Sequence, residues 1–355
     1  MHFCDNGRMA NDIRVGVIGF GLAGRIFHAA VVAETPGLEL ACIVQRRGDE
    51  AAQAHPGVRI ARSIEEMLED RSIHLVVVGT PNYAHFEHGM QCLRAGRNVM
   101  IDKPFTLTSE EATGLIDEAR KQGVLLTAYQ NRRWDGDFVT VKQVLASGRL
   151  GRVVSYESYY DRFREQPRLE EWRESGAPGG GTLFNLGSHL IDQATALFGN
   201  PRSLWADVRI ERENGVVDDA FDLLLKFDGI TAQLHATTVA AFPGPRFVVH
   251  GTKGSFVKWG LDPQEDALKA GAKFSDAGFG EEPEPEWGTL YIPGQPAEKV
   301  RTAAGDYRGI YANVRDAILG KTKLEVTPEQ AWRTTRLIEL AQLSSAKGRR
   351  VAFKD

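Results

Sequence analysis

The sequence predicts an N-terminal α/β domain with a parallel sheet, followed by a C-terminal α+β domain with a large, mainly antiparallel sheet. Up to about residue 130, short strands without polar alternation alternate with helices, a pattern typical of sheets covered on both faces. A glycine loop follows the first of these strands. Beyond residue 130 the strands come in series. A chain of 355 residues is also long enough for two hydrophobic cores.

In the N-terminal half, continuous apolar runs predict five strands, at residues 13–18, 38–44, 74–78, 98–101 and 124–128. Helices are expected between them, at residues 25–34, 84–95 and 108–122. Ser63 and Glu66 form a capping box for a further short helix. This alternation predicts a Rossmann dinucleotide-binding domain at residues 12–130, preceded by a disordered segment at residues 1–11.

The C-terminal half, residues 131–355, is predicted to bind the substrate and to form oligomers. It begins with a linking helix at 134–147. Strands are expected at 153–160, 203–211, 221–227, 231–239, 246–250 and 255–259. Residues 260–304, rich in Gly, Pro and Glu, are predicted to form a mobile loop or lid. Two closing helices, at 308–319 and 328–346, are candidates for packing back on the first domain.

Composition and net charge limit the classes of partner that this protein is expected to bind. The net charge of −4 argues against nucleic acid, and no apolar run of about eighteen residues suggests a membrane span. Cys4, Cys42 and Cys92 lack the spacing of a disulfide framework or a zinc site, and His85 with His88 lacks a third ligand, so no metal is expected. We expect a cytoplasmic protein with a small-molecule substrate. Apolar positions on the antiparallel strands favour association into a homodimer or homotetramer.

The glycine loop, Gly19-Phe20-Gly21-Leu22-Ala23-Gly24, matches G-x-G-x-x-G between a strand and a helix. Gly19 permits the tight turn and Gly21 lets the backbone approach a pyrophosphate. Gly24 lets the helix pack closely on the strand, while the helix N-terminus offers free N–H groups to the anion. The sequence therefore predicts a dinucleotide at this loop.

The end of the second strand indicates which dinucleotide. Sites that prefer NAD usually carry an acidic residue there, but this chain has Val44-Gln45-Arg46-Arg47. Guanidinium groups bind a 2′-phosphate in fork geometry, so Arg46 and Arg47 favour NADP over NAD. The alternative is that both arginines are solvated loop charges.

Further motifs resemble the Gfo/Idh/MocA oxidoreductases, the glucose–fructose oxidoreductase and inositol dehydrogenase group, over nearly the whole chain. The general motifs are Thr80-Pro81-Asn82 with His85, Asp102-Lys103-Pro104, and Gly179-Gly180-Gly181 leading into Asn185 to Asp192. Four passages are similar to the bacterial subgroup that contains NADP-dependent scyllo-inositol dehydrogenases: 102–106, 131–135, 161–164 and 187–193.

The resemblance implies hydride exchange, at the domain interface, between nicotinamide and a secondary alcohol of a sugar, polyol or cyclitol. It implies cofactor contacts from Thr80, Pro81, Asn82, His85, Asp102, Lys103, Trp172 and Arg173. Tyr160, Asp161 and Arg162 end a strand that is a candidate to face the substrate. For both sets of residues, Trp172 with Arg173 and the strand end at 160–162, the alternative is ordinary packing at an interface.

Oxidising a secondary alcohol requires a base and a cation near the developing alkoxide, and Lys103 and His189 are the candidates. Lys103 follows a parallel strand at the edge where such sheets bind ligands, and burial there is expected to lower its pKa. If residues 182–198 are helical, Asn185, His189 and Asp192 share one face. His189 then serves as base or binds the hydroxyl, and Asp192 holds its ring.

Two positions depart from the family pattern. Asp102 replaces the usual Glu before the lysine, as it also does in the subgroup. Asn185 stands where the family usually has Asp, which weakens a relay centred on His189 because an amide carries no charge. Either Lys103 takes the proton while Asn185 binds a substrate oxygen, or the activity has drifted.

Two other functions remain open. Some relatives oxidise a sugar transiently with tightly held nicotinamide, so that an adjacent bond breaks as in a glycoside hydrolase or lyase. The other is a non-catalytic protein that senses nicotinamide nucleotide and regulates a partner, a role that the resemblance to a fungal relative implies.

Overall fold

The computed structural model describes residues 13–354, so the predicted disordered segment and Cys4 lie outside the described residues. The chain divides into two compact units. Within the described residues, the first unit contains 13–105, 110–129 and 307–329, and the second contains 106–109, 130–306 and 330–354. The penultimate helix therefore belongs to the first unit, together with the glycine loop.

The first unit contains a six-stranded parallel sheet in the order β3-β2-β1-β4-β5-β6. Its strands are β1 (Ile13–Ile18), β2 (Leu38–Val44), β3 (Arg59–Ala61), β4 (Leu75–Val78), β5 (Asn98–Ile101) and β6 (Leu126–Ala128). The strand order reverses beside β1, and such switch points bind ligands at the carboxyl edge. The predicted Rossmann fold is confirmed.

The α-helices of the first unit range from 4 to 14 residues in length. They are α1 (Ala30–Ala33), α2 (Glu50–Ala54), α3 (Ile64–Leu68), α4 (His85–Arg94), α5 (Ser109–Gln122) and α9 (Arg308–Ile318), with the single turn η2 (Asn82–Ala84). The predicted cap is present, since Ser63 Oγ accepts the Glu66 N–H at 3.1 Å. The Glu66 carboxylate, however, accepts from Arg62 N–H at 2.7 Å.

The helix expected at 25–34 is not a single α-helix. It begins as a π-helix, η1 (Ala23–Ala29), and continues as α1. A π-turn inserts one extra residue into the helical repeat, and such turns are frequent at functional sites. Sequence periodicity does not reveal it, because the inserted residue looks like any other member of the apolar face.

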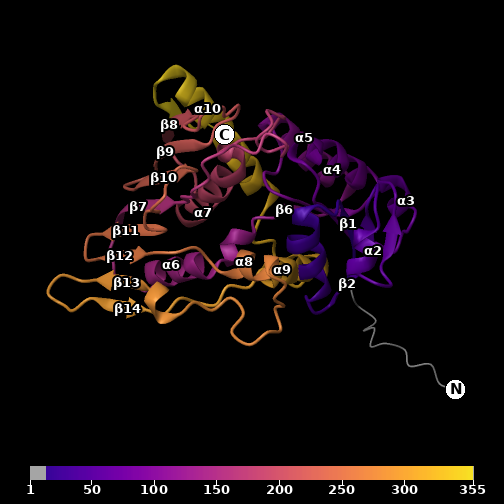
Figure 1. The fold of residues 1–355 in the computed structure, drawn as a ribbon, viewed down its shortest axis with the longest axis horizontal. Helices are drawn as coiled ribbons and strands as arrows, with labels where there is room; N and C mark the ends of the chain where they lie inside the picture. The colour runs from indigo at the N-terminus through magenta and orange to yellow at the C-terminus, as the bar shows by residue number, and fades with distance from the viewer. Residues whose placement is uncertain (1–12, 355) are drawn as a thin grey trace. The chain divides into compact units, whose positions relative to one another are not determined.

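The second unit contains a nine-stranded sheet in the order β14-β13-β12-β11-β7-β10-β9-β8-β15 (Figure 1). Its longer strands are β7 (Val153–Tyr159), β8 (Ser203–Arg209), β9 (Ala220–Lys226), β10 (Thr231–Thr237), β11 (Phe247–Gly251) and β12 (Ser255–Lys258). Neighbouring strands are antiparallel except β7 and β10, which are parallel. This confirms the predicted mainly antiparallel sheet.

Three helices cover one face of this sheet: α6 (Gly136–Ala146), α7 (Ser188–Phe198) and α10 (Pro328–Lys347). Their apolar side chains form one core with the inward residues of the strands, for example Phe138, Ile191 and Leu337 against Leu223 and Phe247. The alternating burial along β8, β9 and β10 follows from the alternation of side chains in a strand.

The prediction of a loop at 260–304 is wrong. The segment contains α8 (Gln264–Lys269), the turn η5 (Glu284–Glu286), β13 (Gly288–Tyr291) and β14 (Glu298–Val300), and the two strands extend the sheet beyond β12. The two strands are too short to show a periodic pattern, so only their pairing defines them. The same holds for β15 (Val351–Ala352), which pairs with β8.

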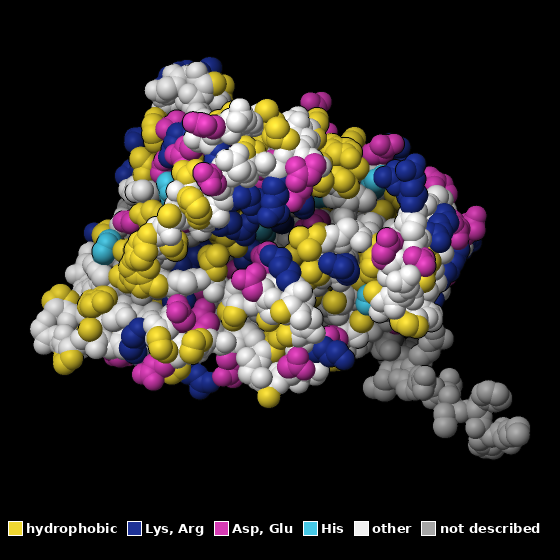
Figure 2. Space-filling view, viewed as in Figure 1, with side chains coloured by type: hydrophobic (Ala, Val, Ile, Leu, Met, Phe, Trp, Pro, Cys, Tyr) yellow, Lys and Arg dark blue, Asp and Glu magenta, His cyan; other side chains and the backbone are white. Residues whose placement is uncertain are grey.

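The opposite face of the second sheet carries half-buried side chains. One row across the strands contains Trp205, Leu224, Gln233, Glu157, Val248 and Val257. On the face of the molecule seen in Figure 2, cationic side chains stand in groups among acidic ones. No helix within residues 13–354 is long and apolar enough to cross a membrane.

Candidate functional site

The glycine loop fits a pyrophosphate. Gly19 has φ of 94°, and a Cβ there would lie 2.9 Å from the Gly79 carbonyl oxygen. A Cβ on Gly24 would collide with the Gly19 carbonyl oxygen, so both positions require glycine for packing. Gly21 differs, because it is exposed and a Cβ on it would meet no atom of residues 13–354 within 4 Å. The space above Gly21 is therefore open to a ligand.

The other loop residues surround this open space. The Phe20 ring packs edge-on against His55, with centroids 5.9 Å apart. The Leu22 side chain is 47% exposed, and Ala23 begins η1. The loop therefore offers backbone N–H groups and one apolar side chain at its surface.

The predicted NADP determinants lie in a braced loop. Arg46 and Arg47 are exposed after β2, and neither forms an ion pair within residues 13–354. Arg62 Nη1 donates to the carbonyl oxygens of Gln45 at 3.0 Å and Gly48 at 2.7 Å. Sequence reasoning missed Arg62, since nothing in the local pattern links it to a loop fourteen residues earlier.

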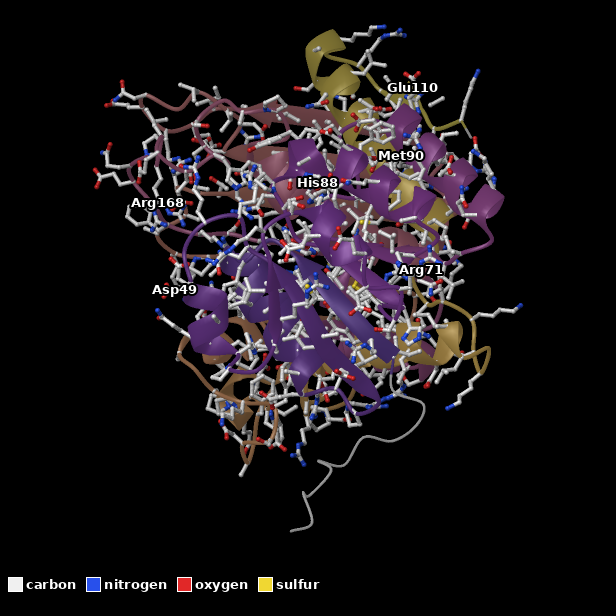
Figure 3. The ribbon with its side chains drawn as sticks, turned by 90° about the vertical axis from the view of Figure 1, so that its right-hand side faces the viewer. Asp49, Arg71, His88, Met90, Glu110 and Arg168 are labelled. Atoms are coloured by element: carbon white, nitrogen blue, oxygen red, sulfur yellow. The ribbon has the colours of Figure 1, made fainter. Side chains whose placement is uncertain are left out.

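His85 holds the loops after β4 and β5 together. The residue is fully buried, with Nδ1 2.8 Å from the Pro104 carbonyl oxygen and Nε2 2.9 Å from that of Thr80. Burial lowers the pKa of His85. One turn along α4, the His88 labelled in Figure 3 has its Nδ1 3.1 Å from Thr80 Oγ1. Thr80, Pro81 and buried Asn82 therefore belong to a rigid loop at the sheet edge.

Asp102 and Lys103 leave β5 at the same carboxyl edge. Asp102 is 8% exposed and its Oδ1 accepts the Lys103 N–H at 2.7 Å. Burial raises the pKa of Asp102, but the His28 ring and the Lys103 ammonium outweigh it and lower the pKa to about 2. Lys103 is half-buried. A carboxylate that is ionised at neutral pH thus directly precedes the candidate catalytic lysine.

In the second unit, the predicted helix at 182–198 begins as a π-helix, η4 (Leu183–Gly187), before α7. Asn185 is half-buried, His189 is 3% exposed and Asp192 is 1% exposed. The polar residues therefore lie on a continuous helix that is almost entirely buried, and a π-turn falls where the chemistry was predicted.

Arg133 is the partner of Asp192. Its Nε donates to Asp192 Oδ2 at 2.8 Å and its Nη2 donates to Oδ1 at 2.7 Å. The neighbouring Gln193 donates to the Arg132 carbonyl oxygen at 2.8 Å. Two consecutive residues of α7 are thus attached to the turn η3 (Asn131–Trp134). Residues 131–135 carry part of the family resemblance, but neither that resemblance nor the local pattern predicts a role for Arg133.

Asp218 holds the start of the same helix. It accepts the Leu183 N–H at 2.6 Å through its carboxylate and the Thr182 N–H at 2.8 Å through its carbonyl oxygen. A Cβ on Gly181 would collide with this carboxylate, which explains the last glycine of the Gly179–Gly181 run. Burial raises the pKa of Asp218 to about 6. Sequence reasoning missed this residue, thirty-five positions away.

Tyr160 lies among three guanidinium groups. Those of Arg132, Arg162 and Arg246 lie 5.0, 4.8 and 5.4 Å from its ring centroid. Arg162 also donates to the Tyr160 hydroxyl at 3.1 Å, while Asp161 lies 3.3 Å from His235. Arg162 is half-buried and forms no ion pair within residues 13–354.

Trp172 and Arg173 also stack, with the guanidinium carbon 4.5 Å from the indole centroid. The Arg173 carbonyl oxygen accepts the Gly181 N–H at 2.9 Å, so this pair sits beside the glycine run.

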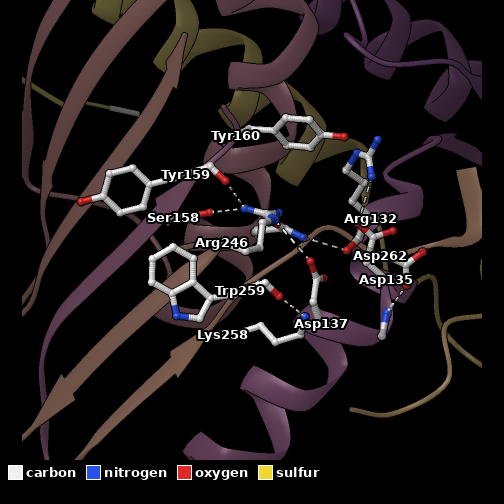
Figure 4. A network of polar contacts seen from close by, with 12 residues as sticks. Arg132, Asp135, Asp137, Ser158, Tyr159, Tyr160, Arg246, Lys258, Trp259 and Asp262 are labelled. Atoms are coloured by element: carbon white, nitrogen blue, oxygen red, sulfur yellow. Dashed lines mark hydrogen bonds and ion pairs between the residues drawn. The ribbon is translucent and has the colours of Figure 1, made fainter. Parts of the chain in front are cut away.

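A buried network of charges lies below Tyr160 (Figure 4). Arg246 pairs with Asp137 at 3.3 Å, and Arg132 pairs with Asp135 at 3.1 Å. Asp262 accepts the Gly136 N–H at 2.6 Å. Burial, and then the charge of Asp137, raise the pKa of Asp262 to about 7. Within residues 13–354, no group of three or more His, Cys, Asp or Glu residues is arranged to hold a metal ion.

Comparison with known proteins gives two family matches. Residues 13–130 match the model described as an oxidoreductase family, NAD-binding Rossmann fold, and residues 142–353 match its C-terminal alpha/beta domain. The uncharacterized oxidoreductase YdgJ of Escherichia coli is 40% identical, covering 96% of this chain and 98% of its own.

A curated relative and a solved structure from Bacillus subtilis are also similar. The scyllo-inositol 2-dehydrogenase (NADP(+)) IolW is 36% identical and covers 98% of each chain. The solved structure of the oxidoreductase yvaA superposes with a TM-score of 0.94 at 36% identity, covering 98% of this chain and 100% of that one.

Proposed function

The chain belongs to the Gfo/Idh/MocA family of NAD(P)-binding oxidoreductases, and we propose that it transfers hydride between NADP and a secondary alcohol or carbonyl of a polyol, cyclitol or sugar. One observation carries the proposal. The open glycine loop after β1 and the half-buried Lys103 after β5 lie at the same carboxyl edge of one parallel sheet. A phosphate cradle and a proton-transferring group therefore belong to the same edge.

The cofactor would be held by the backbone of the loop from Gly19 to Gly24, with Thr80, Pro81, Asn82 and His85 shaping the neighbouring loop. When bound, the nicotinamide supplies or accepts the hydride. Arg46 and Arg47 would bind the 2′-phosphate of NADP, which is supported by their exposure and by the bracing of their loop by Arg62. The name of IolW agrees with this preference.

Lys103 is proposed to take the proton from the reacting hydroxyl in oxidation and to return it in reduction. His189 is proposed to bind or deprotonate the same hydroxyl, and Asn185 to bind a substrate oxygen. Because Arg133 neutralises Asp192, we propose that Asp192 acts by fixing the helix under His189. Tyr160 and Arg162 are proposed to contact further hydroxyl groups, and Trp172 and Arg173 the cofactor.

The test is turnover by the purified protein. NADP+ and NAD+ would each be offered with scyllo-inositol, other cyclitols and aldoses, and reduction followed by absorbance. We expect reduction of NADP+ with at least one polyol. Absence of turnover with every pair would contradict the proposal. Glycoside release without net reduction of coenzyme would favour transient oxidation, and cofactor binding without either reaction would favour a sensor.

We also propose a homodimer or homotetramer that associates through the outer face of the second sheet. The half-buried row that includes Trp205, Leu224, Val248 and Val257 gives this face its apolar contact surface. Sedimentation of the wild type beside Val248→Lys would test it. A monomeric wild type, or an unchanged assembly in the variant, would contradict this interface.

A further inference from the structure

His28 is a buried histidine in the first unit to which neither the cofactor proposal nor the proton proposal gives a role. It lies near the end of η1 and is 0% exposed. Its ring packs edge-on against Tyr129, the residue after β6, with centroids 4.6 Å apart. A Cβ on Gly79 would lie 2.9 Å from His28 Cδ2. The ring therefore sits at the carboxyl edge of the sheet, beside the loops after β4 and β6.

Each ring nitrogen faces a different polar group. Nδ1 lies 2.8 Å from the Tyr311 hydroxyl, which α9 contributes from 283 positions away. Nε2 lies 3.6 Å from Asp102 Oδ2 and, among residues 13–354, has no hydrogen-bond partner at a normal distance. A buried ring nitrogen without a full hydrogen bond is costly, so packing alone would be served better by an apolar side chain.

These contacts select one arrangement of protons. The ionised Asp102 carboxylate attracts a proton on Nε2, which leaves Nδ1 as the acceptor for the Tyr311 O–H. In this arrangement Tyr311 donates to His28 Nδ1, and the Nε2–H of His28 faces Asp102. The other oxygen of Asp102 accepts the Lys103 N–H at 2.7 Å. One buried chain of contacts thus runs from Tyr311 to the backbone of Lys103.

We propose that His28, held by Tyr311, is a positioning residue for Lys103 and acts through Asp102. This inference rests on the proposed function, because it takes Lys103 as the proton-transferring group. The charged and titratable groups that face Asp102 are His28, Lys103 and His85, and those that face Tyr311 are Tyr129 and Asp102. His28 keeps the carboxylate in place and partly offsets its charge.

Two isosteric variants separate the two ring nitrogens. The amide of Asn reaches the position of Nδ1, whereas that of Gln reaches the position of Nε2. We expect His28→Asn to lose the contact with Asp102 and His28→Gln to keep it. His28→Asn should lower kcat on the order of 10- to 100-fold with an unchanged KM for NADP+, while His28→Gln retains most of kcat.

The pH profile distinguishes positioning from packing. Without the Nε2–H, the Asp102 charge acts more strongly on Lys103 and favours its ammonium form. In His28→Asn, the part of the kcat–pH profile that reports the titration of Lys103 should therefore move to higher pH. Tyr311→Phe should cause a smaller shift in the same direction. His74→Asn, an exposed control in the same unit, should leave kcat and the profile unchanged.

A measurement without turnover completes the test. Nitrogen NMR should place the His28 proton on Nε2, and carbon NMR should show the pKa of Asp102 rising from about 2 in the wild type toward its ordinary value in His28→Asn. If no substrate reacts, the proposed function fails, and these spectra still decide the coupling. A proton on Nδ1, an unmoved Asp102 titration, or equal kcat in His28→Asn and the wild type would overturn the proposal.

Discussion

Arg133 donates hydrogen bonds to both carboxylate oxygens of Asp192, at 2.8 and 2.7 Å. The two side chains are 8% and 2% exposed, so this ion pair is buried. This fork attaches η3 to α7 at a residue three positions after His189. In such a buried pair each charge depends on the other, because neither retains water to solvate it. The candidate proton-transferring histidine therefore stands on a helix whose position is fixed electrostatically.

The pair yields a prediction for stability. Arg133→Met leaves the Asp192 charge buried and uncompensated, so the free energy of unfolding should fall by about 3–5 kcal/mol. The double variant Arg133→Met with Asp192→Leu should lose less than the sum of the two single variants. Urea denaturation of the wild type, the two single variants and the double variant measures this coupling. The exposed pair Arg149–Glu298 is the control, and its removal should hardly move the midpoint. Additive single effects would show that the fork is not coupled.

Lys103→Met should abolish most turnover. Without the amine, the reacting hydroxyl loses the proton acceptor proposed for it and only His189 remains, so we expect kcat to fall on the order of 10²- to 10⁴-fold. NADPH fluorescence should still report binding, because the glycine loop remains intact. Lys121→Met, at a side chain 71% exposed on α5, is the matched control. Full activity of Lys103→Met would remove the assignment.

Asn185→Asp should change the pH dependence of turnover. Asn185 and His189 are four residues apart on a continuous helix, so their side chains are neighbours. A carboxylate at position 185 stabilises the imidazolium form of His189, so the part of the kcat–pH profile that reports the titration of His189 should move to higher pH. Steady-state kcat across the pH range measures it, with Asn185→Ala as the uncharged comparison. Identical profiles for both variants would show that His189 does not titrate in turnover.

Arg46→Ala with Arg47→Ala should reduce the preference for NADP over NAD. Losing charged hydrogen bonds to a 2′-phosphate should raise the KM for NADP+ about 10- to 100-fold and leave that for NAD+ nearly unchanged. Arg62→Ala should act in the same direction because it releases the loop. Arg71→Ala, an exposed arginine of the same unit labelled in Figure 3, is the control. Equal loss with both coenzymes would contradict the assignment.

Asp262 should make stability depend on pH. Its pKa is about 7 in the folded chain against 3.8 for the ordinary group, so the folded state binds the extra proton between these values. The stabilisation is complete below pH 3.8 and is lost as the pH rises through about 7. The decline is about 1.4 kcal/mol per pH unit.

Asp262→Asn stays neutral and should lack that decline in urea unfolding. Asp266→Asn, at a side chain 92% exposed, should keep it. Parallel curves for the wild type and Asp262→Asn would show that Asp262 is ionised at neutral pH.

The sequence by itself determined the Rossmann unit and the class of the second domain. Buried parallel strands are continuous apolar runs, and the glycine loop has local requirements that can be read residue by residue, so β2 appears at the predicted 38–44. The family motifs further identified Lys103, Asn185 and His189 as candidates, which the structure places at the end of β5 and along η4 and α7.

Tertiary structure alone decided the partners of these residues. Arg133 with Asp192, Asp218 with Leu183, and His28 with Tyr311 are separated by 59, 35 and 283 positions. Sequence patterns also failed to predict the π-turns at η1 and η4 and the strands β13, β14 and β15. A contact between distant segments leaves no periodic signal in either one, because each segment satisfies its own helix or strand pattern whatever it later meets.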